Sequence, residues 1–259
     1  MLKCFDLTGK NAVVTGGNRG LGRSMAEGLA ESGANIFLIA TNAASLEKAA
    51  ADIAAKYGVE CDWAVADITN EDQVNAAVDK CIARFGHIDI LLNNAGTDRV
   101  PQHPEEAELS KWRRVIEINV NGAFIVAQAV GKHMIQMGNG GKIINLSSIC
   151  GYTINPMTCA GSYDVSKHGV VALTRALAVE WAKYNIQINA IAPGYFMTEP
   201  NRQACDEIPG LEESVNRTVP LGRWANPDEL KGLAVFLSSD ASSYLEGCII
   251  TIDGGVTIT

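Results

Sequence analysis

Short apolar runs alternate with longer segments in which apolar residues recur at spacings of three and four, almost from end to end of the chain. The short runs predict buried strands, and the longer periodic segments predict amphipathic helices. Strands are expected at residues 11–15, 35–40, 61–66, 88–93, 141–147, 186–192 and 248–253. Helices are expected near residues 20–32, 42–57, 71–85, 111–137, 160–184 and 227–238. This alternation predicts an α/β fold of the Rossmann type, a doubly wound parallel sheet of seven strands with helices on both faces.

The predicted elements run through the chain without an internal repeat, a low-complexity tract or a polar linker. We therefore expect one domain covering residues 1–259. Residues 199–226 depart from the alternation, because they are rich in Glu, Asn, Arg and Pro. Long connections in compact domains often carry function. This segment is expected to be either a solvated connection or a lid over a substrate pocket.

Composition excludes several classes of protein. The chain is 47% hydrophobic and 19% charged, as is ordinary for a globular protein, and its net charge of −8 without a Lys/Arg stripe argues against nucleic-acid binding. The seven cysteines and four histidines show no metal-ligand spacing, so we expect free thiols and no metal site. Apolar runs long enough for a membrane span or a signal peptide are absent from the sequence, which predicts a cytoplasmic protein without a membrane partner.

Three glycines, Gly16, Gly20 and Gly22, follow the first predicted strand and open the first predicted helix. Glycines at this position allow a tight turn and let backbone N–H groups approach a pyrophosphate at the helix N-terminus. The cluster therefore predicts a dinucleotide site, although an ordinary turn would use the same residues.

The end of the second predicted strand bears on the choice of cofactor. An NAD site commonly places an acidic side chain there to hold the ribose 2′-hydroxyl, but the strand ends in Thr41 and Asn42, and the next acid is Glu47 in the following helix. Arg19 in the glycine loop could pair with a 2′-phosphate. We predict NADP, with NAD as the alternative. In the competing interpretation Arg19 is solvated and Thr41 or Asn42 caps a helix.

Two further segments lie at the predicted ligand edge of the sheet. Asp67 follows the third strand, where its carboxylate could accept a hydrogen bond from an adenine amino group or could cap the next helix. Asn94, Ala95 and Gly96 follow the fourth strand, and their small size suits a backbone pressed against a ribose.

Tyr163 and Lys167 are four residues apart in a segment with helical periodicity, so their side chains share a helix face. An ammonium beside a phenol lowers the pKa of the phenol, which would let the tyrosine exchange protons near neutral pH. The pair is therefore a candidate for general acid–base catalysis.

These motifs occur in one order, together with Asn119, Ser148, Pro193-Gly194 and Asp253-Gly254-Gly255. The set resembles the classical short-chain dehydrogenase/reductase family over about residues 5–257. The resemblance implies that Ser148 hydrogen-bonds the substrate oxygen, that Tyr163 exchanges the proton, and that Lys167 assists Tyr163 and holds the nicotinamide ribose. Asn119 would support a water-linked proton relay through Lys167. Ser147 is the alternative to Ser148.

The resemblance also implies a cofactor-binding set. Thr198 would bond the nicotinamide carboxamide, and the backbone near Phe196 would help to orient the ring. The full set is Gly16, Asn18, Arg19, Gly20, Leu21, Gly22, Thr41, Asp67, Ile68, Asn94, Ala95, Gly96, Tyr163, Lys167, Pro193, Gly194, Phe196 and Thr198. The family further implies a homotetramer in which the helices at 111–137 and 160–184 form subunit contacts.

Residues 192–199, 218–224 and 234–243 most resemble the gluconate 5-dehydrogenase-like branch, which acts on sugar acids and polyols. Arg99 and Arg202 are candidates to meet a substrate carboxylate, whereas Arg223 and Trp224 are expected to pack against the base of the lid or to form a subunit contact.

Two alternative functions stay open. One is a reductase of 3-oxoacyl thioesters or of a bulky apolar ketone such as a steroid, which the following apolar residues would suit: Met157, Tyr195, Phe196 and Met197. The other is a dinucleotide-binding sensor or scaffold without catalysis.

Overall fold

The computed structural model describes residues 2–97, 103–154 and 161–258. Seven parallel strands form one sheet in the order β3-β2-β1-β4-β5-β6-β7. The strands are β1 (Asn11–Thr15), β2 (Asn35–Ala40), β3 (Cys61–Val65), β4 (Ile90–Asn93), β5 (Gly141–Leu146), β6 (Ile186–Pro193) and β7 (Ile249–Ile252). The predicted doubly wound, seven-stranded α/β fold is confirmed.

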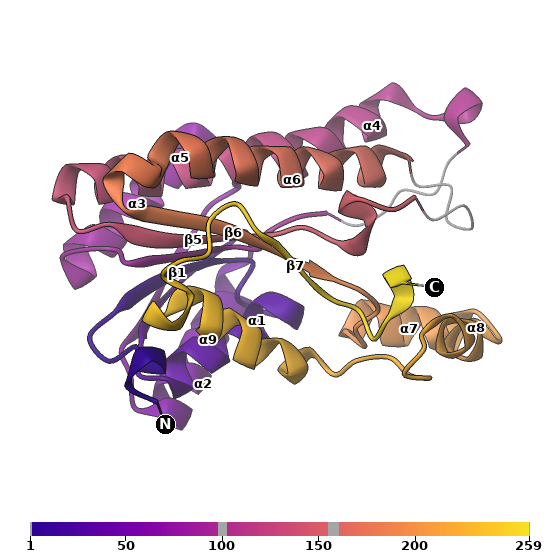
Figure 1. Ribbon diagram of the computed structural model, residues 1–259, viewed down its shortest axis with the longest axis horizontal. Coiled ribbons are helices and arrows are strands. Elements are labelled where there is room, and N and C mark those ends of the chain that lie inside the picture. Colours follow the sequence, from indigo (N-terminus) through magenta and orange to yellow (C-terminus); the bar gives the residue numbers. More distant parts are fainter. Residues whose placement is uncertain (1, 98–102, 155–160, 259) are drawn as a thin grey trace.

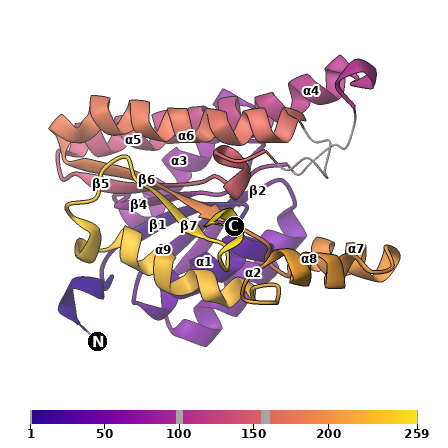
Figure 2. The ribbon, with the colours of Figure 1, turned by 45° about the vertical axis from the view of Figure 1, so that its right-hand side comes forward.

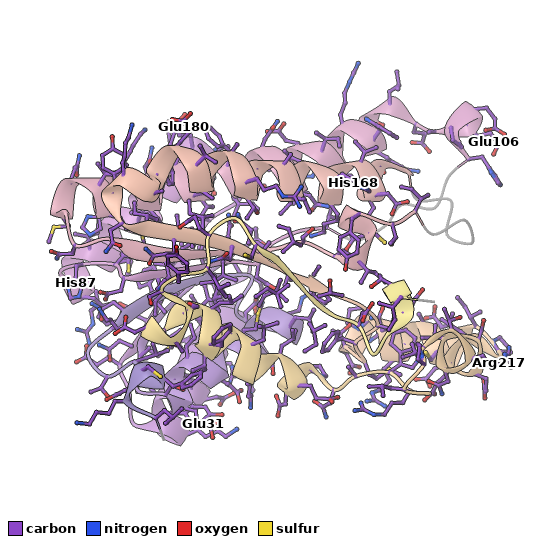
Figure 3. The ribbon with its side chains drawn as sticks, viewed as in Figure 1. Glu31, His87, Glu106, His168, Glu180 and Arg217 are labelled. Atoms are coloured by element: carbon purple, nitrogen blue, oxygen red, sulfur yellow. The ribbon has the colours of Figure 1, made fainter. Side chains whose placement is uncertain are left out.

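Helices cover both faces of this sheet (Figure 1). The helices are α1 (Gly20–Glu31), α2 (Ala43–Tyr57), α3 (Glu71–Phe85), α4 (Leu109–Ile116), α5 (Ala123–Met137), α6 (Gly161–Trp181), α7 (Glu199–Glu207), α8 (Leu211–Thr218) and α9 (Lys231–Ser238). One layer contains α3, α5 and α6, and the other contains α1, α2 and α9. Glu180 on α6 points away from the sheet (Figure 3).

Apolar residues fill the space between the sheet and each helical layer. Met25, Leu29 and Leu46 pack beneath one face, and Val126 and Val130 pack above the other. All five residues of β1 are buried. Because these strands are buried on both faces, their sequences are continuous apolar runs instead of alternating apolar and polar residues.

The strand order reverses between β1 and β4, and in open parallel sheets ligands bind at the carboxyl ends of the strands beside such a point. The glycine loop follows β1, and the segment Asn94–Gly96 follows β4. The fold therefore brings the two predicted cofactor segments together. Helices α7 and α8 lie beyond the carboxyl end of the sheet, on the same side of the molecule (Figure 2).

Two elements differ in detail from the predictions. Residues 199–226, expected to be a solvated connection or a lid, contain the two helices α7 and α8, for which no helix was predicted. The predicted helix at 111–137 is present, but it runs from α4 into a π-helical segment, Glu117–Gly122, and then into α5. Among the residues described, no helix is long and apolar enough to cross a membrane, and no His, Cys, Asp or Glu cluster could hold a metal ion.

Candidate active site

The glycine loop between β1 and α1 has the geometry of a phosphate cradle. Gly16 and Gly20 have φ angles of +65° and +57°, which residues with a side chain rarely adopt. A Cβ atom at Gly22 would collide with Asn94 Nδ2 and with the carbonyl oxygen of Gly16. The backbone therefore passes close to its neighbours at the start of α1, where its N–H groups are available to an anion.

Asn94 fastens this loop to the end of β4. Its Nδ2 donates to the carbonyl oxygens of Thr15 and Gly16, at 2.8 and 3.3 Å. Thr15 Oγ1 in turn accepts from the backbone N–H groups of Asn94 and Ala95, each at 2.9 Å. The Asn94 side chain thus supports the loop, and its segment continues to Gly96, which leaves space for Asn119 Oδ1.

The corner after β2 is polar and lacks an acid at the strand end. Asn42 caps α2 by accepting from Ser45 N, and Asn18 Nδ2 donates to Ser45 Oγ at 2.9 Å. The cap predicted as the competing interpretation is thus confirmed for Asn42. Thr41 and Arg19 are exposed, and Arg19 pairs with no carboxylate among the described residues. This corner accordingly offers a cation and neutral groups to a ligand.

Asp67 closes a turn instead of capping α3. Its Oδ1 accepts from Thr69 N and Thr69 Oγ1, at 2.9 and 2.8 Å, and these bonds lower the pKa of the carboxyl. The N-cap of α3 is Asn70, which accepts from Gln73 N. The capping alternative predicted for Asp67 is therefore wrong. Its neighbour Ile68 is buried against Gly122.

Tyr163 and Lys167 meet at the start of α6, as the spacing predicted. Lys167 is 6% exposed, and its Nζ donates to the carbonyl oxygen of Leu146 at 2.9 Å. The same Nζ lies 5.5 Å from the centroid of the Tyr163 ring. Because Leu146 ends β5, the edge of the sheet holds the ammonium beside the phenol.

Ser148 follows the end of β5, whose last residue, Leu146, accepts the hydrogen bond from Lys167. Its Oγ accepts from Cys150 N at 3.1 Å and so caps the short turn Ile149–Gly151. Ser147 differs, because its Oγ donates to the backbone carbonyl of Lys167 at 3.2 Å. Ser147 thus uses its proton to hold α6, which favours Ser148 as the group that donates to a substrate oxygen.

Asn119 is buried in the π-helical segment Glu117–Gly122. Its Oδ1 accepts from Thr97 N at 2.8 Å, and its Nδ2 donates to Thr97 O and to Ser166 Oγ. It therefore joins the chain after β4 to helix α6. π-Helical turns are frequent at functional sites, but the sequence pattern gave no signal for this one.

One cavity of about 490 Å³ brings Ser148, Tyr163 and Lys167 together at the carboxyl ends of β4, β5 and β6. Its volume lies within the range of small-ligand sites. The predicted residues on its wall are Leu21, Asn94, Gly96, Ser147, Ser148, Tyr163, Lys167, Pro193, Gly194, Tyr195, Phe196 and Thr198. The wall also contains residues that were not predicted to contact a ligand: Thr97, Leu146, Ile149, Asn201, Leu211, Ser214, Val215, Thr218 and Trp224.

Several candidates lie elsewhere. Asn119 and Arg202 on α7 do not line this cavity. The members of the predicted cofactor set that do not line it are Gly16, Asn18, Arg19, Gly20, Gly22, Thr41, Asp67, Ile68 and Ala95. Arg99 and Met157 fall outside the described residues. The signal for the missed residues of α8 was weak: Leu211, Ser214, Val215 and Thr218 recur at spacings of three and four, but only two of them are large and apolar.

A nicotinamide dinucleotide fits the residues present. The glycine cradle would lose its shape with any Cβ at Gly22, and the loop lies beside a cavity that reaches Ser148, Tyr163 and Lys167. The cradle would hold the pyrophosphate, and the cavity would place the reactive ring beside the phenol.

The chain belongs to the short-chain dehydrogenase/reductase family. A family model described as Enoyl-(Acyl carrier protein) reductase matches residues 16–257. Members are NAD(P)-dependent oxidoreductases, and this chain is one that acts on CH–OH groups. This membership favours the enzymatic interpretation over the sensor or scaffold.

Two relatives and one solved structure show which proteins this chain is similar to. The chain is 42% identical over 255 residues to a 2-dehydro-3-deoxy-D-gluconate 5-dehydrogenase of Escherichia coli, covering 98% of each. It is 39% identical over 254 residues to a D-threitol dehydrogenase of Mycolicibacterium smegmatis, covering 98% of this chain and 95% of that one. A solved gluconate 5-dehydrogenase of Burkholderia cenocepacia, in complex with NADP and tartrate, is 40% identical with a TM-score of 0.93 and covers 100% and 99% of the two chains.

Proposed function

We propose that this protein transfers a hydride between NADP(H) and a secondary alcohol or ketone of a sugar acid or polyol. The observation that carries the proposal is the meeting of Ser148, Tyr163 and Lys167 on one cavity beside the glycine cradle. The sugar-acid and polyol names of the relatives support the substrate class.

Side chains of this protein carry out the proton transfer. In the oxidation direction, Ser148 donates a hydrogen bond to the substrate hydroxyl oxygen, and the phenolate of Tyr163 accepts the hydroxyl proton. The Lys167 ammonium, held by Leu146 O, stabilises negative charge on the phenol oxygen before that transfer. A bound nicotinamide cofactor would supply the hydride chemistry of the reaction in either direction. Reduction uses the same groups in reverse.

Two features support NADP as the preferred cofactor. Arg19 is exposed beside the corner after β2, and the strand end carries no acid that would repel a 2′-phosphate. The gluconate 5-dehydrogenase of Burkholderia cenocepacia was solved with NADP. A charge-assisted hydrogen bond from Arg19 to the phosphate would account for such a preference.

A substrate and cofactor panel tests the proposal. We expect oxidation of gluconate, mannitol or sorbitol, with a higher kcat/KM for NADP than for NAD. Arg19→Ala should lower kcat/KM for NADP about tenfold or more and leave NAD unaffected. Arg84→Ala, which removes an exposed arginine on α3, is the matched control. A clear NAD preference of the wild type would contradict the cofactor assignment.

A second candidate is the reduction of a bulky apolar ketone. The observation that favours it is the apolar part of the cavity wall, formed by Leu211, Val215 and Tyr195. A hydroxysteroid panel run beside the polyols separates the two. Turnover of the steroids with no turnover of sugar acids or polyols would replace the proposed substrate class.

A further inference from the structure

One face of helix α8 forms part of the cavity wall. The residues of α8 that line the cavity are Leu211, Ser214, Val215 and Thr218. Because they recur at spacings of three and four, their side chains share one face of the helix. The charged residues Glu212, Glu213 and Arg217 occupy the other faces and are exposed, and Arg217 points outward at the edge of the molecule (Figure 3). The helix therefore presents two apolar groups and two hydroxyl groups to the cavity.

The lid side, the part of the wall that α7 and α8 contribute, carries no charged side chain among the described residues. Lys167 is the one charged side chain on the described wall, and it lies at the sheet side against Leu146 O. Arg223 forms two hydrogen bonds with the Glu229 carboxylate, at 2.7 and 2.8 Å, and does not line the cavity. A carboxylate buried against the lid side would lack a compensating charge, whereas a hydroxyl group needs only a hydrogen-bond partner.

The two hydroxyl groups of α8 differ in the hydrogen bonds that they have left to make. Thr218 Oγ1 donates its proton to Ser214 O at 3.0 Å, so it can only accept from a ligand. Ser214 Oγ has no hydrogen-bond partner among the described residues. The enclosed side-chain atoms without a partner include Asn216 Oδ1 on the same helix but not Ser214 Oγ, so the Ser214 oxygen is accessible. Ser214 can therefore both donate and accept.

Ser214 and Thr218 are four residues apart on one helix, which places their Cβ atoms about 5–6 Å from each other. A ligand hydroxyl beside them could accept a hydrogen bond from Ser214 Oγ and donate one to Thr218 Oγ1. A ketone oxygen could only accept, and a methyl group could do neither. The pair thus favours a ligand group that donates and accepts, while Leu211 and Val215 offer apolar surface to the carbon chain next to it.

We infer that Ser214 and Thr218 together bind one hydroxyl group of the substrate and so determine specificity for a hydroxylated molecule. The reacting oxygen is assigned to Ser148 and Tyr163, so the hydroxyl group at α8 is a different one. The inference rests on the proposed function and adds to it that the lid side recognises a neutral, hydroxylated part of a polyol or sugar acid. Ser214 and Thr218 act in binding, and the proton transfer stays with Tyr163.

The first test removes each hydroxyl and keeps the shape of the side chain. Ser214→Ala and Thr218→Val should each raise KM for the best polyol or sugar acid about threefold to tenfold, the range that one hydrogen bond contributes. The kcat should stay within about twofold and KM for NADP should not change. Ser110→Ala, which removes an exposed hydroxyl from α4 outside the cavity, is the matched control and should match the wild type.

Analogues of that substrate that lack one hydroxyl each provide the second test. The wild type should have a KM about tenfold higher for one monodeoxy analogue than for the parent, whereas the double variant Ser214→Ala/Thr218→Val should have equal KM values for the two. An unchanged KM for the parent in the folded double variant overturns the inference, as does an analogue penalty of the same size in the double variant.

The wild type alone keeps the inference testable if the double variant does not fold. Equal wild-type KM values for the parent and for every monodeoxy analogue then overturn it. Failure of the proposed function has a different signature, because the wild type would turn over no polyol or sugar acid at all.

Discussion

At the scale of single residues, the position of Lys167 explains how the site can move a proton. Leu146 O holds its ammonium at 2.9 Å, 5.5 Å from the centre of the Tyr163 ring. The spacing of four residues on a helix was enough to predict this pairing. The partner of the ammonium could not be predicted, because it comes from the end of β5, a distant part of the sequence. The position of the Ser214 and Thr218 hydroxyls on the cavity wall was missed for a similar reason, since it depends on tertiary packing.

Removal of Lys167 tests its role in proton transfer. Lys167→Ala should lower kcat about 10²- to 10⁴-fold, the range by which a positioned acid–base group contributes. Lys183→Ala is the control, because Lys183 also lies beside a tyrosine ring, that of Tyr184, but outside the cavity. Steady-state kinetics measures both. A kcat near the wild-type value in Lys167→Ala would show that the ammonium is dispensable.

At the scale of elements, strongly periodic segments were predicted well and short ones were not. The eight residues of α8 contain only two large apolar residues, Leu211 and Val215, which is too weak a pattern to define a helix against a polar background. The π-helical segment Glu117–Gly122 leaves the hydrophobic pattern of its helix almost unbroken, so nothing in the sequence revealed that Asn119 would be turned toward Thr97 and Ser166.

The glycine loop gives a prediction at this scale. Gly22→Ala should lower the free energy of unfolding by about 1–3 kcal/mol, because its Cβ would overlap Asn94 Nδ2 and Gly16 O. It should also raise KM for the cofactor. Gly232→Ala in α9 has open space and is the control, with a gain of up to about 1 kcal/mol. Urea unfolding measures the free energy of unfolding of both variants. Equal values for the two variants would contradict the close approach of Gly22 to Asn94 and Gly16.

At the scale of the whole molecule, Glu27 joins three helices of one layer. It lies on α1 and contacts Tyr57 and Lys56 from the α2 region and Lys231 from α9. Burial opposes its ionisation, but hydrogen bonds from Arg23, Tyr57 and Lys56 outweigh burial and hold the pKa of Glu27 at about 2. The charged form of this residue is therefore part of the stable fold.

This cluster predicts acid sensitivity. Because the pKa of Glu27 is lower in the folded state than its ordinary value of 4.5, its stabilisation is present above pH 4.5 and is lost as the pH falls toward 2. Glu27→Gln should therefore be less stable than the wild type at pH 7, and the difference should shrink below pH 4.5. Glu31→Gln, exposed on the same helix, is the control. A difference that stays constant with pH would contradict the account.

The homotetramer stays a prediction, and the outer faces of α5 and α6 are where its subunit contacts are expected. Phe124, Val165 and Val179 are 39%, 51% and 80% exposed there. Exposed apolar groups of this kind favour protein–protein contact. Light scattering should give the mass of four chains, and Val179→Lys should reduce it, whereas Val65→Lys on the edge strand β3 should not. A monomeric wild type would refute the assembly.

The most direct test of the whole account is the Tyr163→Phe variant, because it removes one oxygen from the group assigned to proton transfer. We expect kcat to fall about 10²- to 10⁴-fold or more, while fluorescence titration shows that NADPH still binds. Tyr184→Phe, in the short 3-10 helix Ala182–Tyr184 that follows the far end of α6, should match the wild type. A Tyr163→Phe enzyme that binds NADPH and turns over within twofold of the wild type would contradict the account.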